Sequence, residues 1–213
     1  MPFVSLAQNK LERQFFIRPG VDLSRFAVPY MNDNNQKAWE VNLDCEIKYR
    51  YFPVVELGSN SVKINTKTYE YKSEGSYMRF GFNYNMLNYR QRFDRNIFFV
   101  GFRYGISNFT HEAPYIKISN EWGDYKSSFE NTNINAHWTE FVIGLRGEIL
   151  KNIYLGYTFR VKQMLKHSDY NNLAPYWTPG FGKGSSGRLV GMSYSISYAI
   201  PIKNPKPILP EGY

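Results

Sequence analysis

Apolar and polar residues alternate without interruption from Ala38 to Tyr51. From Trp39 onward the odd positions are apolar or aromatic, and from Glu40 onward the even positions are polar or charged. Successive side chains of a strand point to opposite faces, so this pattern predicts a β-strand with one apolar face and one charged face.

The same period of two, read together with turn-forming clusters, predicts eight strands. The segments are Arg13–Phe26, Ala38–Tyr51, Val54–Ile64, Ser76–Leu87, Asn96–Ser107, His137–Ile149, Ile153–Lys166 and Arg188–Ile200. In the last five, large apolar side chains oppose glycine, serine, asparagine and charged residues. Two strands fit less well, because the first contains Pro19 and the third loses its alternation beyond Gly58, and we expect a bulge or bend near each.

Long and short connections alternate along the chain. The long ones are Ala27–Lys37, Asn65–Gly75, Asn108–Ala136 and His167–Gly187. Long loops at one end and short turns at the other are typical of outer-membrane barrels. We therefore predict an all-β fold, an eight-stranded antiparallel transmembrane β-barrel with long extracellular loops and short periplasmic turns.

A soluble barrel of the lipocalin type is the alternative architecture. Its apolar face would point inward, with the same period of two. The asymmetry of the loops counts against it, and so do apolar faces dominated by aromatic side chains too large for so small a lumen. No apolar stretch approaches the roughly 18 residues of a membrane helix.

The net charge of +8 raises the possibility of a nucleic-acid partner. The basic residues, however, alternate with apolar ones inside the predicted strands and are interleaved with acids. This placement predicts charge pairs in the barrel interior and no nucleic-acid partner. The structural interior charges are predicted to be Arg79, Arg103, Glu140, Arg146, Glu148 and Arg160.

The chain is expected to form one domain with two appendages. Ser5 and Ala7 precede Gln8 at the spacing of a signal-peptidase site, so residues 1–7 are interpreted as the remnant of a signal peptide. Residues 8–200 would form the barrel, and residues 201–213 a proline-rich periplasmic tail.

Catalytic and metal-binding signals are weak. Cys45 is the only cysteine, and no cluster of ligating side chains appears, so we expect no metal site and no cofactor. His111, His137 and His167 fall at the outer rim or in outer loops, where a histidine base could serve a lipid A-modifying hydrolase or acyltransferase. Ser168 follows His167 directly, which is a poor arrangement for a relay because neighbouring residues on a strand point to opposite sides.

The last long loop is rich in aromatic residues, among them Tyr176, Trp177 and Phe181. Exposed apolar groups at this density either pack on one another within a structured loop or bind a partner. We name these three residues as candidate partner contacts, and both alternatives stay open.

The candidate cleavage site before Gln8, the eight aromatic strands and the tail together resemble a family of small outer-membrane barrels of Bacteroidota. The resemblance implies an integral protein of the outer membrane, in contact with its lipids, that is non-enzymatic. It also implies an accessory role in a larger complex with other outer-membrane proteins or surface lipoproteins, such as the barrel-assembly machinery. The rim-histidine enzyme and a surface adhesin are the alternatives, whereas a diffusion pore is not expected because an eight-stranded lumen is filled by side chains.

Overall fold

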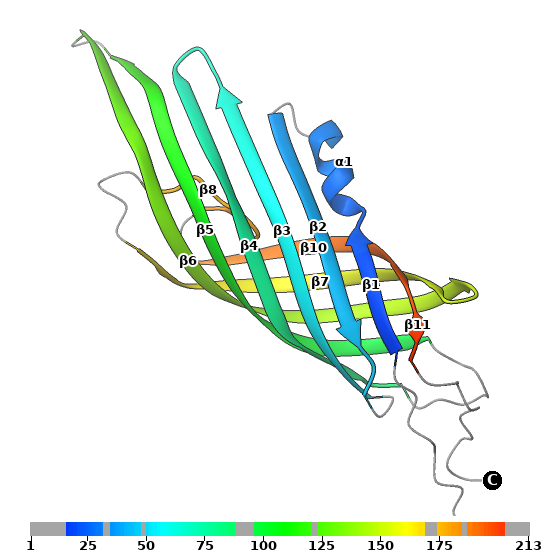
Figure 1. The fold of residues 1–213 in the computed structure, drawn as a ribbon. Helices are drawn as coiled ribbons and strands as arrows, with labels where there is room; N and C mark the ends of the chain where they lie inside the picture. The colour runs from blue at the N-terminus through cyan, green and yellow to red at the C-terminus, as the bar shows by residue number, and fades with distance from the viewer. Residues whose placement is uncertain are drawn as a thin grey trace, which may run out of the picture.

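Eight antiparallel strands form a closed ring in the computed structural model, which describes residues 16–31, 35–47, 50–87, 96–120, 123–168, 174–184 and 187–202. The ring follows the order β10-β7-β6-β5-β4-β3-β2-β1 and closes through pairing of β10 with β1 (Figure 1). This confirms the predicted all-β, eight-stranded antiparallel fold. The signal-peptide remnant and nearly all of the predicted tail lie outside the described residues.

The ring strands are β1 (Phe16–Asp22), β2 (Asn35–Cys45), β3 (Tyr51–Asn65), β4 (Tyr69–Asn85), β5 (Ile97–Asn120), β6 (Gly123–Leu150), β7 (Ile153–His167) and β10 (Arg188–Tyr198). Three short strands accompany them: β8 (Trp177–Thr178), β9 (Gly182–Lys183) and β11 (Ile200–Pro201). The one helix of the described residues, α1 (Ser24–Met31), is not long and apolar enough to cross a membrane.

Helix α1 begins where the first strand was expected to continue. The Asp22 carboxylate accepts hydrogen bonds from the backbone N–H of Ser24 at 2.9 Å and from its hydroxyl, which satisfies a donor at the start of the helix. The prediction that the first strand continues to Phe26 was therefore wrong, because β1 ends at Asp22. The prediction of a loop from Ala27 was also wrong as far as Met31, where the helix ends. Helix α1 lies beside β2 (Figure 1).

Pro19 interrupts the seam of the ring rather than bending the strand. Strand β1 pairs with β11 at Phe16 and Ile17, and with β10 from Gly20 onward, in one continuous register. The gap between the two ladders falls at the proline, which has no N–H to donate.

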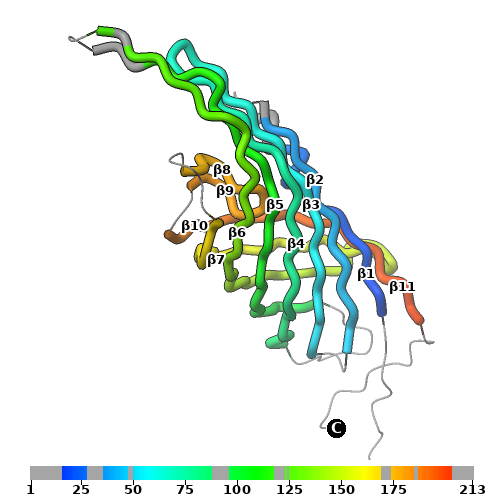
Figure 2. The backbone as a smooth tube through the Cα atoms, turned by 60° about the vertical axis from the view of Figure 1, so that its left-hand side comes forward, coloured from blue at the N-terminus to red at the C-terminus, as the bar shows by residue number. Residues whose placement is uncertain are grey.

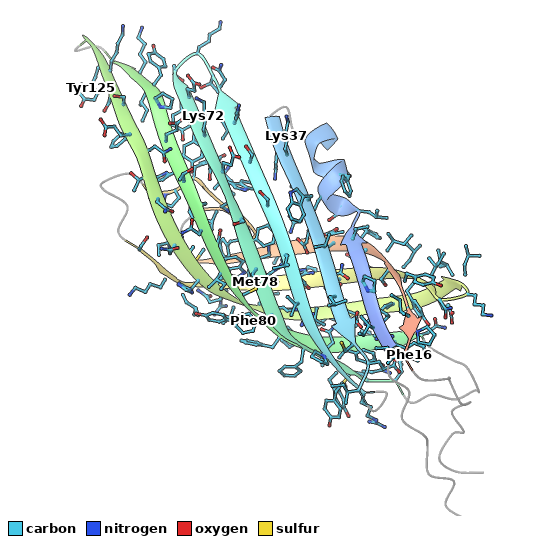
Figure 3. All side chains as sticks on the ribbon, viewed as in Figure 1. Phe16, Lys37, Lys72, Met78, Phe80 and Tyr125 are labelled. Carbon is cyan, nitrogen blue, oxygen red and sulfur yellow. The ribbon has the colours of Figure 1, made fainter. Side chains whose placement is uncertain are left out.

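Outward-facing side chains of the ring form a surface that we call the apolar belt. On β4, Phe80 and Phe82 are 43% and 54% exposed, and Phe80 points away from the ring in Figure 3. The exposed members of the belt are Trp39, Val41, Leu43, Val55, Leu57, Phe80, Phe82, Phe102, Phe141, Ile143, Leu145, Leu155, Val190, Met192 and Tyr194.

Beyond the belt the two faces of the strands exchange their polarity. On β3, Ser59 and Lys63 face outward, whereas Val62 and Ile64 are buried on the inner face. The burial of alternate residues is unbroken along the strand, and its register with β2 and β4 shows no shift. The bulge expected beyond Gly58 is therefore absent, because what changes at that point is the side on which the apolar residues lie.

The same exchange turns two predicted outer loops into strand. Strand β5 carries Thr110 and Glu112 outward beyond Ile106, with Phe109 and Ala113 buried inside. The ranges predicted as loops, Asn65–Gly75 and Asn108–Ala136, lie mostly within β3, β4, β5 and β6.

We call residues 59–65, 69–76, 108–120 and 123–135 the projecting sheet. It rises from one side of the ring as a continuation of β3 to β6 (Figures 1 and 2). Its inner face is apolar, and this face carries the structures described next.

Candidate functional site

The loop between β7 and β10 folds back onto the inner face of the projecting sheet. We call its described part, residues 174–184, the lid. Strands β8 and β9 pair within it, Trp177 with Lys183 and Thr178 with Gly182. Figures 1 and 2 place this small hairpin beside the strands of the projecting sheet.

Two polar side chains of β4 attach the lid to the projecting sheet. The Ser73 hydroxyl donates to the Trp177 carbonyl at 3.0 Å. The Tyr71 hydroxyl accepts hydrogen bonds from the backbone N–H groups of Tyr176 at 3.1 Å and Trp177 at 3.3 Å. Tyr71 is fully buried, and this burial raises the pKa of its hydroxyl, so the group is protonated and can donate in turn.

The lower end of the lid is attached to the wall of the ring. Lys162 Nζ on β7 donates to the carbonyl of Gly180 at 2.7 Å and to that of Phe181 at 2.9 Å. Phe181, 1% exposed, packs edge-on against Trp138 with ring centroids 6.1 Å apart. The lid thus covers the ring where the projecting sheet begins.

Tyr77 connects the lid to the charges beneath it. A Cβ atom added to Gly180 would lie 2.5 Å from Tyr77 Cγ, so the backbone of the lid rests directly on the aromatic ring. Gly180 also has a φ of +79°, a conformation that glycine adopts at low cost. The Tyr77 hydroxyl donates to Glu40 Oε2 at 2.6 Å.

Glu56 is the centre of a buried network of charges inside the ring. Its carboxylate lies 2.8 Å from Arg79 Nε, 3.3 Å from Arg103 Nε and 2.8 Å from Arg160 Nη1. All of these side chains are at most 7% exposed. Charges withdrawn from water to this degree need partners, and three guanidinium groups around one carboxylate require further acids nearby.

Glu140 and Glu40 supply those acids. Glu140 contacts Arg160 at 3.1 Å and Arg79 at 3.3 Å, and it accepts a hydrogen bond from Trp138 Nε1 at 2.7 Å. Glu40 pairs with Arg79 and accepts the bond from Tyr77 described above. The network therefore extends from β2 across to β7.

The predicted interior charges fall into two groups and one outlier. Arg79, Arg103, Glu140 and Arg160 meet in the network around Glu56, whereas Arg146 pairs with Asp44 in a second group that includes Arg18. Glu148 is half-buried at the β6–β7 turn, where it accepts a hydrogen bond from the N–H of Asn152 at 2.7 Å.

Glu40, Glu56 and Asp44 were not among the predicted interior charges, although Glu40 and Asp44 stand on the charged face that the alternation from Ala38 to Tyr51 predicts. A small polar cavity of about 50 Å³ remains among these side chains, enough for one or a few water molecules. The side chains of the network around Glu56 and of the group around Asp44 occupy the lumen beside this cavity.

The three aromatic residues named as partner contacts are all used within the lid. Phe181 is buried, and Tyr176 and Trp177 are half-buried against the apolar cluster of Val62, Ile64 and Tyr71. Packing within a structured loop, the first of the two alternatives, describes their present contacts. A partner contact through their remaining exposed edges stays a prediction.

His111, His137 and His167 stand on three different strands, β5, β6 and β7. His111 is buried inside the projecting sheet with its ring near Tyr71, and burial lowers its pKa. His137 faces outward at the upper edge of the belt and shares a hydrogen bond of 3.1 Å with the Tyr104 hydroxyl. No group of three potential metal-ligating His, Cys, Asp or Glu side chains occurs among the residues for which coordinates are described.

Comparison with known proteins adds a family but no characterised relative. No curated protein matches the chain significantly. The family described as "Domain of unknown function (DUF6048)" matches residues 6–205, which include the whole ring, the projecting sheet and the lid. The chain therefore belongs to the DUF6048 family.

Proposed function

We propose that the protein is an integral barrel of the outer membrane that serves as a non-enzymatic accessory or scaffold subunit of a larger outer-membrane complex. The apolar belt supports the membrane location. Its outward positions on β5 run from Phe98 to Ile106, close to the roughly 9 to 11 residues with which a tilted strand crosses a bilayer. Polar residues face outward immediately beyond Ile106, as they would where a strand leaves the lipid.

An uncovered edge of the projecting sheet is the observation that carries the partner-binding role. Strand β7 accompanies β6 only as far as Ala136 opposite His167, with one further contact between Ser168 and Asn135. From Gly123 to Ile134 no described strand pairs with the outer edge of β6. Figures 1 and 2 show this part of β6 as the margin of the projecting sheet.

An open strand edge is a template for pairing with another chain, and proteins normally blunt it with lysine, proline, bulges or a covering element. The opposite margin of the projecting sheet, at β3, is paired with β2 from Ser59 to Lys63, and helix α1 lies beside β2. The β6 margin contains no proline and only three charged residues, Asp124, Lys126 and Glu130. The register of this margin with β5 shifts on both sides of Ala113, which marks bulges there. Closer to the ring, the stretch from Thr132 to Asn135 is regular.

The filled lumen supports a role other than transport. The networks around Glu56 and Asp44 occupy the ring. The lid covers the end of the ring from which the projecting sheet rises. A rim-histidine hydrolase that uses His137 or His111 has less support, since the hydrogen bond of His137 goes to Tyr104 and His111 is buried.

Gentle detergent extraction of the native protein, followed by size analysis and mass spectrometry, tests the accessory role. The proposal predicts that the chain leaves the membrane in a stoichiometric complex with other envelope proteins. A lone particle of the 25.0 kDa chain in its detergent would contradict it.

A pair of variants at Asn133 tests the open edge as the contact. The N–H and C=O of Asn135 both point to this edge, since they bond to Ser168, so the regular alternation of the ladder also directs the Asn133 N–H there. Asn133→Pro removes this donor without breaking a bond to β5, whereas Asn133→Ala keeps it. We expect the proline variant to lose about tenfold in partner retention through one lost hydrogen bond, while the alanine variant keeps it; equal retention by both would exclude pairing at this edge.

A further inference from the structure

A second feature of the outer wall lies where the apolar belt meets the polar face of the projecting sheet. A groove of about 460 Å³ opens here across β2 to β6. We call it the outer groove, and its lining includes Trp39, Leu57, Met78, Asn108, Asn135 and His137.

The wall beneath the groove is continuous. Gly58, Ser76 and Ser107 belong to its lining, and Gly58 and Ser107 stand at buried, inward-facing positions of their strands. The ladders of β3 with β4 and of β4 with β5 run through these positions without a shift in register. The groove is therefore a depression in a continuous, hydrogen-bonded wall.

The two halves of the groove differ in chemistry. The half within the belt is apolar, with Trp39 50% and Leu57 44% exposed beside Met78. The half beyond the belt presents two amides and an imidazole. Asn108 Nδ2 donates to Asn135 Oδ1 at 2.7 Å, and in the described structure this leaves Asn108 Oδ1 as an acceptor and Asn135 Nδ2 as a donor for a ligand.

From this division we infer that the outer groove binds an amphiphile with an uncharged, hydroxyl-rich headgroup, that is, a glycolipid. Its acyl chain lies along Leu57 and Met78, and its sugar contacts Asn108, Asn135 and His137. The lining contains no lysine or arginine, so its charge does not match a phosphate, which cationic side chains would hold. Neutral amides suit hydroxyl groups, since they both donate and accept hydrogen bonds, and Trp39 offers a flat apolar face to a sugar ring.

The inference rests on the proposed membrane insertion but not on the partner protein. It is tested with the full chain in nanodiscs of a phosphocholine lipid, by following the side-chain amide resonances of Asn108 and Asn135 in NMR titrations. The probes are dodecyl maltoside and dodecylphosphocholine, which share a chain and differ in the headgroup, together with maltose alone. We expect saturable shifts with dodecyl maltoside, and at most weak shifts with the other two.

Variants then assign the contacts. His137→Ala and Asn108→Ala, followed at the remaining amide of Asn135, should each weaken dodecyl maltoside binding about five- to tenfold through one lost hydrogen bond. Thr110→Ala is the control, because it lies on the same face of β5 one step beyond Asn108. Equal shifts with both amphiphiles, or an affinity unchanged in both variants, would overturn the inference.

The test separates this inference from the proposed function. Complex formation that persists in His137→Ala while glycolipid binding is lost shows two independent sites. If the amide shifts are the same with both amphiphiles while the protein still forms its complex with the partner, the glycolipid site is refuted and the proposed function is not. Failure of the chain to insert into nanodiscs would defeat both.

Discussion

At the scale of single residues, Gly180 shows how closely the lid fits its support. Gly180 and Gly184 both have positive φ values, +79° and +99°, but only Gly180 rests on another side chain, Tyr77. Substitution by alanine strains the backbone at both positions, and the clash with Tyr77 is added only at Gly180.

We predict that Gly180→Ala destabilises the closed lid by about 1–3 kcal/mol more than Gly184→Ala does. Limited proteolysis of the lid in detergent checks this, with the rate of cleavage as the measure. Equal cleavage of the two variants would mean that the lid does not depend on the contact with Tyr77.

A second prediction at this scale concerns Glu56. Glu56→Gln leaves three buried arginines with less compensation, whereas Glu148→Gln alters a half-buried acid at a turn. Breaking a buried ion pair by removing one partner costs about 3–5 kcal/mol. We expect Glu56→Gln to lower the free energy of unfolding by an amount of this order. Glu148→Gln should lower it by far less. Thermal unfolding of both variants in the same detergent decides the point, and comparable midpoints would contradict the central role of Glu56.

At the scale of elements, the projecting sheet contains a titratable group inside its apolar face. Burial lowers the pKa of His111 below its usual value of 6.5, so the folded sheet holds the neutral imidazole. The unfolded or opened state then binds a proton more readily. The contribution to stability is full above pH 6.5 and is lost as the pH falls below that value.

We therefore predict that amide exchange in the projecting sheet accelerates between pH 6.5 and pH 5, after correction for the intrinsic rate. His111→Gln removes this imidazole and should weaken the dependence, leaving the contribution of His167, whose pKa burial also lowers. If the variant kept the full dependence on pH, another group would be responsible.

The elements also show what the sequence could predict. Alternation was readable wherever one face was uniformly apolar, as along Phe98 to Ile106, because the apolar belt demands large residues at every second position. The same period continues along Thr110 and Glu112, but there the apolar residues lie inside, and a pattern sought only on the outer face appears to end. Helix α1 was missed because it has only eight residues and directly follows a strand, so the segment is too short for a helical period to be recognised.

Of the site, the sequence indicated which charges lie inside but not how they meet. Arg79 and Glu140 were readable as interior residues because they oppose apolar positions on their strands. Their convergence with Glu56 depends on closure of the ring, which brings β3 and β7 together across the lumen, and no local pattern contains this information. The aromatic lid was recognised as unusual, yet its target, Tyr71, stood within a segment expected to be a loop.

At the scale of the whole molecule, the proposed membrane insertion would place the apolar belt in lipid and the projecting sheet outside the membrane, around a ring whose interior holds the buried charges. An arginine in place of Phe102 in the belt should cost about 2–4 kcal/mol of stability in a bilayer, as charged groups do near its midplane. Thr110→Arg, on the same face of the same strand, should cost close to nothing. Folding titrations of the two variants into lipid vesicles test this, and equal costs would argue against a lipid-facing belt.

Labelling of single cysteines in intact cells shows which of these surfaces lies in lipid. In a Cys45→Ser background, cysteines replace Phe102 in the belt, Thr110 in the projecting sheet and Lys151 at the β6–β7 turn. The account predicts that a membrane-impermeant maleimide labels Thr110→Cys on intact cells, labels Lys151→Cys only after the outer membrane is permeabilised, and leaves Phe102→Cys unlabelled in both cases. Labelling of Phe102→Cys as readily as Thr110→Cys would show that the belt does not lie in lipid and would contradict the account.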